Sequence, residues 1–181
     1  MSKVSVIIPT YNRGDVVLRA LRSVFAQDHA VDQVIVVDDG STDDTIERVE
    51  RNFPEVELIV QTNHGVSHAR NRGIERARNE WLAFLDSDDE WLPGKITAQL
   101  SAIVSDGISR VCHSDEIWVR NGRRVNPMHK HRKYGGDIFL YCLPRCVMSP
   151  SSVVLHRSVV EAVGGFDEML PVCEDYDLWL R

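Results

Sequence analysis

The chain has 181 residues, of which 27 are acidic and 21 basic, and a formal net charge of −6. This length is enough for one domain with a sizeable core, and a hydrophobic fraction of 43% is ordinary for a globular protein. The acidic balance disfavours a general nucleic-acid-binding protein, because such a protein needs basic surface to neutralise phosphates. The four cysteines show no C-x-x-C spacing, which disfavours a zinc site or a disulfide framework.

Apolar runs and amphipathic segments alternate through the first half of the chain. Short β-branched runs predict buried strands at residues 4–9, 33–41, 56–61 and 80–86. Helical spacing follows them at residues 15–27, 41–52, 66–78 and beyond Pro93, which is expected to open the fourth helix. Ser41 or Thr42 is expected to cap the second helix. No signal peptide is expected, because the first apolar run is short and Pro9 interrupts it.

This alternation predicts an α/β fold in which a mostly parallel sheet carries helices on both faces. Ligands of such sheets bind beyond the carboxyl ends of the strands. Each predicted strand is followed directly by a polar run, and these runs are "PTYNR", "DDGSTDD", "TNHG" and "DSDD". We therefore expect the four runs to converge on one cleft.

The second half of the chain is less regular. It predicts a strand at 110–119, a polar loop at 120–136, a strand at 151–157, and helices at 158–165 and 174–181. The last helix has no C-cap signal, so the chain is expected to be cut within an element. The stretch 110–133 is locally basic, and two interpretations stay open: a solvated loop, or a contact for an acidic acceptor or a membrane surface.

The run "DSDD" places Asp86, Asp88 and Asp89 close together at the end of a predicted buried strand. Like charges at this spacing repel unless a cation or water separates them. Oxygen ligands in this pattern suit Mg²⁺ or Mn²⁺, which could in turn hold a diphosphate. No glycine-rich phosphate loop of the GxxxxGK[ST] or GxGxxG type occurs. On spacing alone, a solvated turn remains the alternative.

Six motifs in order, "VSVIIPTYNR", "VIVVDDGSTDDT", "GVSHARNRGI", "WLAFLDSDDEW", "GGFDE" and "EDYDLWLR", closely resemble the family 2 glycosyltransferases. The resemblance implies inverting enzymes with the GT-A, nucleotide-diphospho-sugar-binding fold. It implies a nucleotide-sugar-binding half at 1–106 and an acceptor-side half of the same domain at 107–181, with a mixed extension of the sheet. Between 108 and 148 the resemblance weakens.

The resemblance also assigns roles to particular residues. It implies nucleotide-sugar contacts at Pro9, Thr10, Tyr11, Asn12, Asp38, Asp39, Arg70, Asp86 and Ser87. Within this set Tyr11 would lie near the base, and Asp39 would accept a hydrogen bond from the uracil ring N–H. Asp88, with Asp86, would bind the metal, Mn²⁺ or Mg²⁺. Asp175 would be the general base, with Glu174 beside it.

Structural interpretations of the same residues remain open. Asp38 and Asp39 could be turn or cap residues, and Glu174 and Asp175 at a helix start favour the macrodipole without any catalysis. Ser67, Arg70 and Arg72 could be the exposed face of a helix.

The expected partners are a nucleotide-sugar donor, with UDP as the expected nucleotide, and a saccharide or glycolipid acceptor. No nucleic acid is expected, and the expected location is cytoplasmic, with peripheral contact to the inner face of the membrane. The alternative functions are a nucleotidyltransferase-like enzyme or a non-catalytic nucleotide-sugar-binding module. The former would need a glycine- and lysine-rich loop after the first strand, which "PTYNRGD" does not supply.

Overall fold

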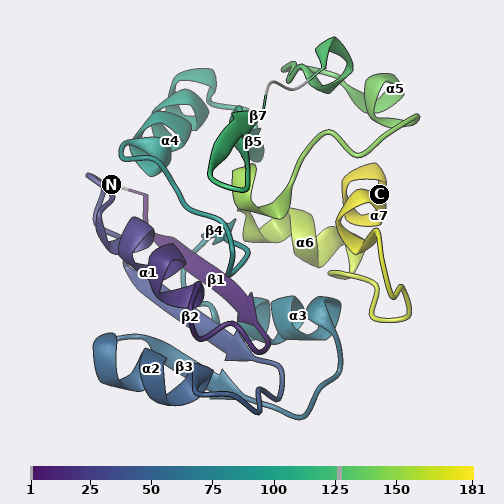
Figure 1. Cartoon of the computed structure of the whole chain (residues 1–181). Coiled ribbons are helices and arrows are strands. Elements are labelled where there is room, and N and C mark those ends of the chain that lie inside the picture. Colours follow the sequence, from purple (N-terminus) through teal and green to yellow (C-terminus); the bar gives the residue numbers. More distant parts are fainter. Residues whose placement is uncertain (1, 126–127) are drawn as a thin grey trace.

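The computed structural model describes residues 2–125 and 128–181. A six-stranded sheet with the order β3-β2-β1-β4-β8-β5 forms its centre (Figure 1). The strands are β1 (Val4–Thr10), β2 (Gln33–Asp38), β3 (Glu57–Val60), β4 (Trp81–Phe84), β5 (Val111–His113) and β8 (Val153–His156). Strands β1 to β4 are mutually parallel, whereas β8 is antiparallel to both β4 and β5. The predicted mostly parallel sheet is therefore confirmed.

Helices cover both faces of this sheet. They are α1 (Val17–Phe25), α2 (Thr45–Asn52), α3 (Val66–Arg76), α4 (Lys95–Asp106), α5 (Phe139–Cys142), α6 (Arg157–Val163) and α7 (Glu174–Leu180), with short 3-10 turns η1 (His129–His131) and η2 (Pro150–Ser152). Apolar side chains of α1, α2 and α4 build one core, and those of α3, α6 and α7 build the other. All seven residues of β1 are buried between the two layers. Within residues 2–125 and 128–181, no helix is long and apolar enough to cross a bilayer.

Two helix starts differ from the predictions. Helix α2 begins at Thr45, where the carboxylate of Asp43 accepts a hydrogen bond from the backbone N–H of Thr45 at 3.0 Å. Ser41 and Thr42 do not cap it, because both bind Asn12 of the loop after β1. Helix α4 begins after Pro93 rather than at it.

The α4 start lies where the backbone changes conformation. Gly94 has a φ of +83°, in the left-handed region, so the helix can begin only at the next residue, Lys95. Helix α3 also ends two residues short of its predicted bound, because Ala77 is extended.

The strand predicted at 110–119 is wrong as a single element. It divides into β5 and a separate strand β6 (Trp118–Arg120), which pairs with β7 (Arg123–Val125) in a two-stranded hairpin. The hairpin also replaces part of the polar loop predicted at 120–136. Asn121 and Gly122 have φ of +50° and +71°, the positive values that a type I′ turn requires. Asn-Gly was therefore the overlooked hairpin signal.

Helix α3 approaches β1 closely because Gly73 has no side chain. A Cβ atom at Gly73 would lie 2.3 Å from Cγ2 of Ile7, a fully buried β1 residue. The close approach matters to the rest of the molecule, because α3 carries Arg70 one turn earlier on its buried face.

We expect Gly73→Ala to lower the free energy of unfolding by about 1–3 kcal/mol, because the added methyl group overpacks a rigid core. The general helix preference for alanine, about 1 kcal/mol, would otherwise predict a gain. Urea unfolding measures the change. Gly135→Ala is the control, since a Cβ there meets no atom within 4 Å. An equal or greater stability of Gly73→Ala would show that α3 and β1 are not tightly packed here.

Candidate active site

A cleft of about 540 Å³ opens beyond the carboxyl ends of β1, β2 and β4, beside the start of α3. Its walls include eight of the predicted site residues: Pro9, Thr10, Tyr11, Asp39, Arg70, Asp86, Ser87 and Asp88. A larger cavity, about 780 Å³, lies between α4, β5, α6 and α7, and none of the predicted residues lines it. The predicted convergence of polar strand ends therefore identifies the smaller cleft as the candidate site.

The loop after β1 contributes one aromatic ring and one structural residue. Tyr11 lines the cleft and is 47% exposed, which leaves its ring open to a ligand. Asn12 has a φ of +51°, and its side-chain oxygen accepts a hydrogen bond from the backbone N–H of Thr42 at 2.8 Å. Asn12 is not among the residues that line the cleft. Its observed contacts join the loops after β1 and β2.

The two aspartates after β2 have different surroundings. Asp38 is fully buried, and its Oδ1 accepts hydrogen bonds from the backbone N–H groups of Gly40 and Ser41 at 3.1 and 2.7 Å. Asp38 is thus the turn residue of the pair. Asp39 lines the cleft, where it accepts hydrogen bonds from Gln61 Nε2 and from the backbone N–H groups of His64 and Gly65 at 2.7–2.9 Å.

The acidic run after β4 is a tight turn in which each carboxylate has different surroundings. The backbone N–H of Asp89 donates to the carbonyl of Asp86 at 2.9 Å. Asp86 forms an ion pair with Arg70, and Asp88, with 57% of its side chain exposed, lies 3.9 Å from Arg13. The pKa of Asp89 is raised, because protein atoms crowd its carboxyl group and because Asp86 and Asp88 repel its charge.

Arg70 connects this turn to the far end of the chain. Its side chain is 4% exposed, and it donates to Asp86 Oδ1 at 2.8 Å and to Glu174 Oε1 at 2.6 Å. Burial alone would lower the pKa of Arg70, but Asp86 and Glu174 outweigh burial and raise it, so the group stays charged. The alternative that Ser67, Arg70 and Arg72 form an exposed helix face is wrong for Ser67 and Arg70, which are buried, and right for Arg72.

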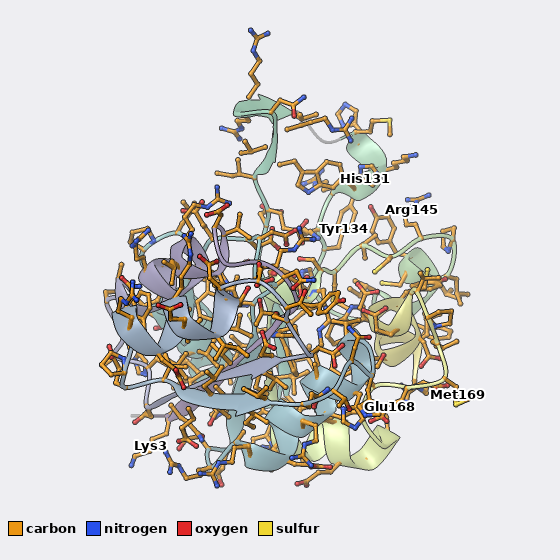
Figure 2. The ribbon with its side chains drawn as sticks, turned by 60° about the horizontal axis from the view of Figure 1, so that its bottom comes forward. Lys3, His131, Tyr134, Arg145, Glu168 and Met169 are labelled. Carbon is orange, nitrogen blue, oxygen red and sulfur yellow. The ribbon has the colours of Figure 1, made fainter. Side chains whose placement is uncertain are left out.

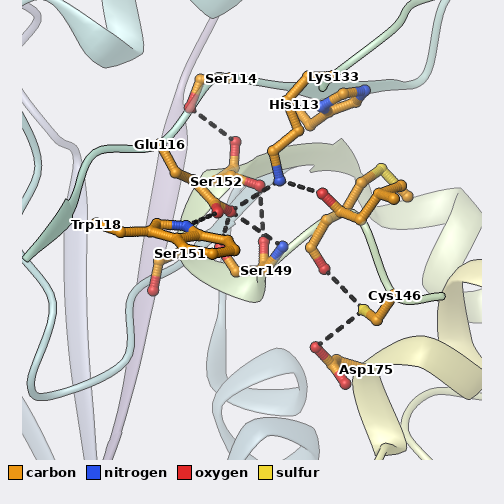
Figure 3. A network of polar contacts seen from close by, with 12 residues as sticks. His113, Ser114, Glu116, Trp118, Lys133, Cys146, Ser149, Ser151, Ser152 and Asp175 are labelled. Atoms are coloured by element: carbon orange, nitrogen blue, oxygen red, sulfur yellow. Dashed lines mark hydrogen bonds and ion pairs between the residues drawn. The ribbon is translucent and has the colours of Figure 1, made fainter. Parts of the chain in front are cut away.

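The ion pair with Glu174 places the first turn of α7 beside the cleft. Asp175 follows Glu174, and burial together with the charge of Glu174 raises its pKa. The thiol of Cys146 lies 3.2 Å from the carbonyl oxygen of Met148 and 3.6 Å from Asp175 Oδ2, so its single proton is shared between these two acceptors (Figure 3). Burial and Asp175 raise the pKa of Cys146 to about 12, so the thiol remains protonated and can donate. Asp175 is not among the residues that line the cleft. Its neighbour in the chain, Glu174, connects it to the cleft by binding Arg70.

A polar network holds the loop that carries Cys146. Glu116 Oε1 accepts hydrogen bonds from the backbone N–H and the hydroxyl of Ser149, and it forms an ion pair with Lys133 at 3.1 Å (Figure 3). Lys133 also donates to the carbonyl of Val147. These contacts lower the pKa of Glu116 despite its burial, so the carboxylate is charged. The loop beside Asp175 is therefore held at Val147 by Lys133 and at Ser149 by Glu116.

Five residues of the cleft wall were not predicted as site residues: Arg13, Asn63, Gly65, Val66 and Ala69. Arg13 belongs to the "PTYNR" run and Asn63 and Gly65 to the "TNHG" run, so the polar strand ends contained the signal for these three. Val66 and Ala69 line the cleft because α3 begins beside it, and nothing in the sequence around them indicated a site.

A family model for glycosyl transferase family 2 matches residues 5–164. The chain belongs to glycosyl transferase family 2. This finding confirms the resemblance that the six motifs indicated.

Curated relatives agree with this membership. The chain is 38% identical over 125 residues to the uncharacterized glycosyltransferase YibD of Escherichia coli strain K12, a match over 67% of this chain and 36% of that protein. It is 36% identical over 174 residues to the uncharacterized glycosyltransferase alr2836 of Nostoc sp., covering 91% of this chain and 54% of the relative. A third relative is WfgD of Escherichia coli, named as a UDP-Glc:alpha-D-GlcNAc-diphosphoundecaprenol beta-1,3-glucosyltransferase, at 31% identity over 98% of this chain and 68% of that protein. The chain thus spans about a third to a half of the first two relatives.

Solved structures confirm the predicted GT-A fold. S. aureus TarS 1-349 in complex with UDP-GlcNAc superposes with a TM-score of 0.74 at 27% identity, over 97% of this chain and 52% of that one. The mannosyltransferase PcManGT from Pyrobaculum calidifontis, in complex with GDP-Man and Mn²⁺, gives a TM-score of 0.72 over 97% of this chain and 50% of that one. Its identity of 21% makes this a likeness of fold alone.

We expect Arg70→Ala to lower the free energy of unfolding by about 3–5 kcal/mol, because it leaves two carboxylates without their buried cation. Arg72→Ala, two residues along the same helix but exposed, should change it by less than about 0.5 kcal/mol. Chemical unfolding of both variants measures the contrast. A small effect of Arg70→Ala would show that Asp86 and Glu174 do not depend on Arg70.

Proposed function

We propose that this chain transfers a sugar from a UDP-sugar to a saccharide or lipid-linked acceptor. The observation that carries the proposal is the guanidinium of Arg70, which contacts both the acidic turn of the cleft and the residue next to Asp175. Donor-side acids and a candidate base thereby belong to one assembly. The UDP-GlcNAc complex of TarS and the UDP-Glc and diphosphoundecaprenol in the name of WfgD support this choice of donor and acceptor class.

The nucleotide would lie along the loops after β1 and β2, where the side chains can receive it. An ionised carboxylate has about four lone-pair sites, and Asp39 uses three of them on the loop that ends at Gly65. One site therefore remains for the ring N–H of uracil, as proposed for Asp39. Tyr11 offers an exposed ring on the same wall for contact with the base. Asp86, held by Arg70, would face the ribose.

Asp88 is the residue of the acidic turn that fits a divalent cation best. Its carboxylate is exposed to the cleft, whereas Asp86 already binds Arg70. In the described part of the chain, no group of three or more His, Cys, Asp or Glu side chains could hold a metal ion. Mg²⁺ often uses only one or two carboxylates and completes its shell with water and substrate phosphates, so this donor set fits. A bound Mg²⁺ or Mn²⁺ would supply positive charge opposite the leaving diphosphate.

Asp175 would take the proton from the acceptor hydroxyl while that oxygen attacks the anomeric carbon, and a single displacement of this kind inverts the configuration. Its raised pKa suits a base more than an ordinary aspartate does, because a weaker acid is a stronger base. Glu174 would hold the start of α7 in place through Arg70, and the thiol of Cys146 would contact the Asp175 carboxylate. Helix α7, helix α3 and the loop that carries Cys146 thus each have a defined part in the proposal.

We expect Asp88→Asn to weaken metal-dependent UDP binding by about tenfold or more, because the carboxylate that would ligate the cation is lost. Calorimetric titration of UDP with and without Mn²⁺ measures this effect. Glu90→Gln is the matched control, since Glu90 is an exposed carboxylate of the same loop that pairs with Arg19. Equal metal dependence in the wild type and in Asp88→Asn would remove Asp88 from the metal site.

We expect Asp175→Asn to lower the rate of UDP release from UDP-Glc or UDP-GlcNAc by about 10²–10⁴-fold with UDP binding unchanged. Asp177→Asn is the control, because Asp177 lies in the same helix turn and pairs with Arg181. The rate of the wild type should fall as pH drops through the pKa of Asp175, which lies above the ordinary 3.8. An unchanged rate in Asp175→Asn, or an equal loss in Asp177→Asn, would contradict the assignment.

A further inference from the structure

The β6–β7 hairpin is exposed on both faces. Every residue of Trp118–Arg120 and Arg123–Val125 is exposed, and Figure 2 shows the hairpin at the top of the view, standing clear of the body. Of its apolar side chains, Val119 is the most exposed, at 64%. A two-stranded hairpin is marginally stable by itself, and exposed apolar side chains that serve no core mark a surface for an interaction.

The hairpin is also positively charged on a negatively charged chain. The segment 117–125 contains Arg120, Arg123 and Arg124 and no acidic residue, although the net charge of the chain is −6. None of the ion pairs that the described residues form involves these three arginines. Their charges are therefore available to an anionic partner.

Cross-strand pairing mixes the two kinds of side chain. Val119 lies opposite Arg124 on one face of the hairpin. On the other face Trp118 lies opposite Val125, and the pair Arg120 and Arg123 follows at the turn. A dissolved polyanion would satisfy the arginines and leave the valines in water. The surface of an anionic bilayer satisfies both, because its headgroups carry negative charge and its interface accepts apolar and aromatic side chains.

The same character continues from the hairpin to α5. The ring of Trp118 lies 4.8 Å from that of His131, and the hydroxyl of Tyr141 donates to the carbonyls of Lys130 and Arg132 at 2.9 Å. Figure 2 shows His131, Tyr134 and Arg145 gathered below the hairpin. On α5 itself Leu140 is 79% exposed, and its neighbour Phe139 is exposed too. The hairpin thus contacts η1 through Trp118 and His131, and α5 contacts the same segment through Tyr141.

We propose that residues 117–125 of the hairpin, together with the exposed side chains of α5, form a docking surface for an anionic lipid bilayer. The stem of the hairpin is Glu116, which binds Ser149 on the loop beside Asp175 and forms an ion pair with Lys133 (Figure 3). Docking would therefore bring the acceptor side of the cleft to the bilayer surface. The surface itself does not depend on sugar transfer, because none of its residues lines the cleft.

Co-sedimentation with lipid vesicles tests this surface. The probes are vesicles of phosphatidylcholine containing phosphatidylglycerol and vesicles of phosphatidylcholine alone. We expect binding only to the former, weakened by salt, and weakened about 10²-fold in the triple variant R120Q/R123Q/R124Q, at about tenfold or less per arginine. The double variant V119S/L140S should also bind these vesicles more weakly than the wild type, although its charge is unchanged.

The control for net charge is R22Q/R51Q/R72Q, which removes three exposed arginines from α1, α2 and α3. It should bind the vesicles as the wild type does. Equal loss in the control triple, or wild-type binding by the hairpin triple, would overturn the proposal. Binding of a single-stranded RNA in place of the vesicles would overturn it as well. Thermal unfolding of each variant confirms that the fold is retained.

Discussion

The structure depends on one buried cation placed between two carboxylates. Arg70 joins α3 to Asp86, sixteen positions away, and to Glu174, which is 104 positions away. Desolvating three charged groups is expensive, and such an arrangement gains little stability over apolar packing. The arrangement instead fixes the positions of the two carboxylates, because both must lie where the N–H groups of the guanidinium can donate to them. The start of α7 is thereby fixed against the turn after β4.

That constraint also explains how three carboxylates can follow a buried strand. Asp86 is neutralised by Arg70, the pKa of Asp89 is raised, and Asp88 faces water with Arg13 at 3.9 Å. The repulsion within the run is therefore divided among three different surroundings. Of the two carboxylates of this run that line the cleft, Asp88 has the weaker contact with the protein, and this leaves it available to a ligand.

The parallel strands β1 to β4 and the site's edge of the sheet could be predicted from the sequence, because buried parallel strands leave continuous apolar runs and the polar residues after each run mark where it ends. The exposed strands β6 and β7 leave no such run. Helix boundaries were less predictable. Ser41 and Thr42 have the right chemistry for a cap, but Asn12 from another loop binds them. The burial of Arg70 could not be read from its own helix, since its partners lie on distant segments and Gly73 sets how closely that helix packs. The hairpin turn at Asn121 and Gly122 was readable, because positive φ at both positions is typical of this dipeptide.

The antiparallel strand β8 gives the sheet a further property. Strands β5 and β8 are neighbours, and the backbone N–H of Ser114 donates to the carbonyl of Ser152 at 3.1 Å, so the excursion 115–151 leaves and re-enters the sheet at one point. Because loop closure depends only weakly on length, the exposed hairpin within this excursion could change in length without altering the register of the six-stranded sheet. The rest of the excursion is tied to the body, because Cys142, Val147 and Met148 belong to the core and the Ser151 hydroxyl accepts a hydrogen bond from the backbone N–H of Asp86. The hairpin is thus the part of the excursion that evolution, or an engineer, could exchange without changing a residue of the cleft wall.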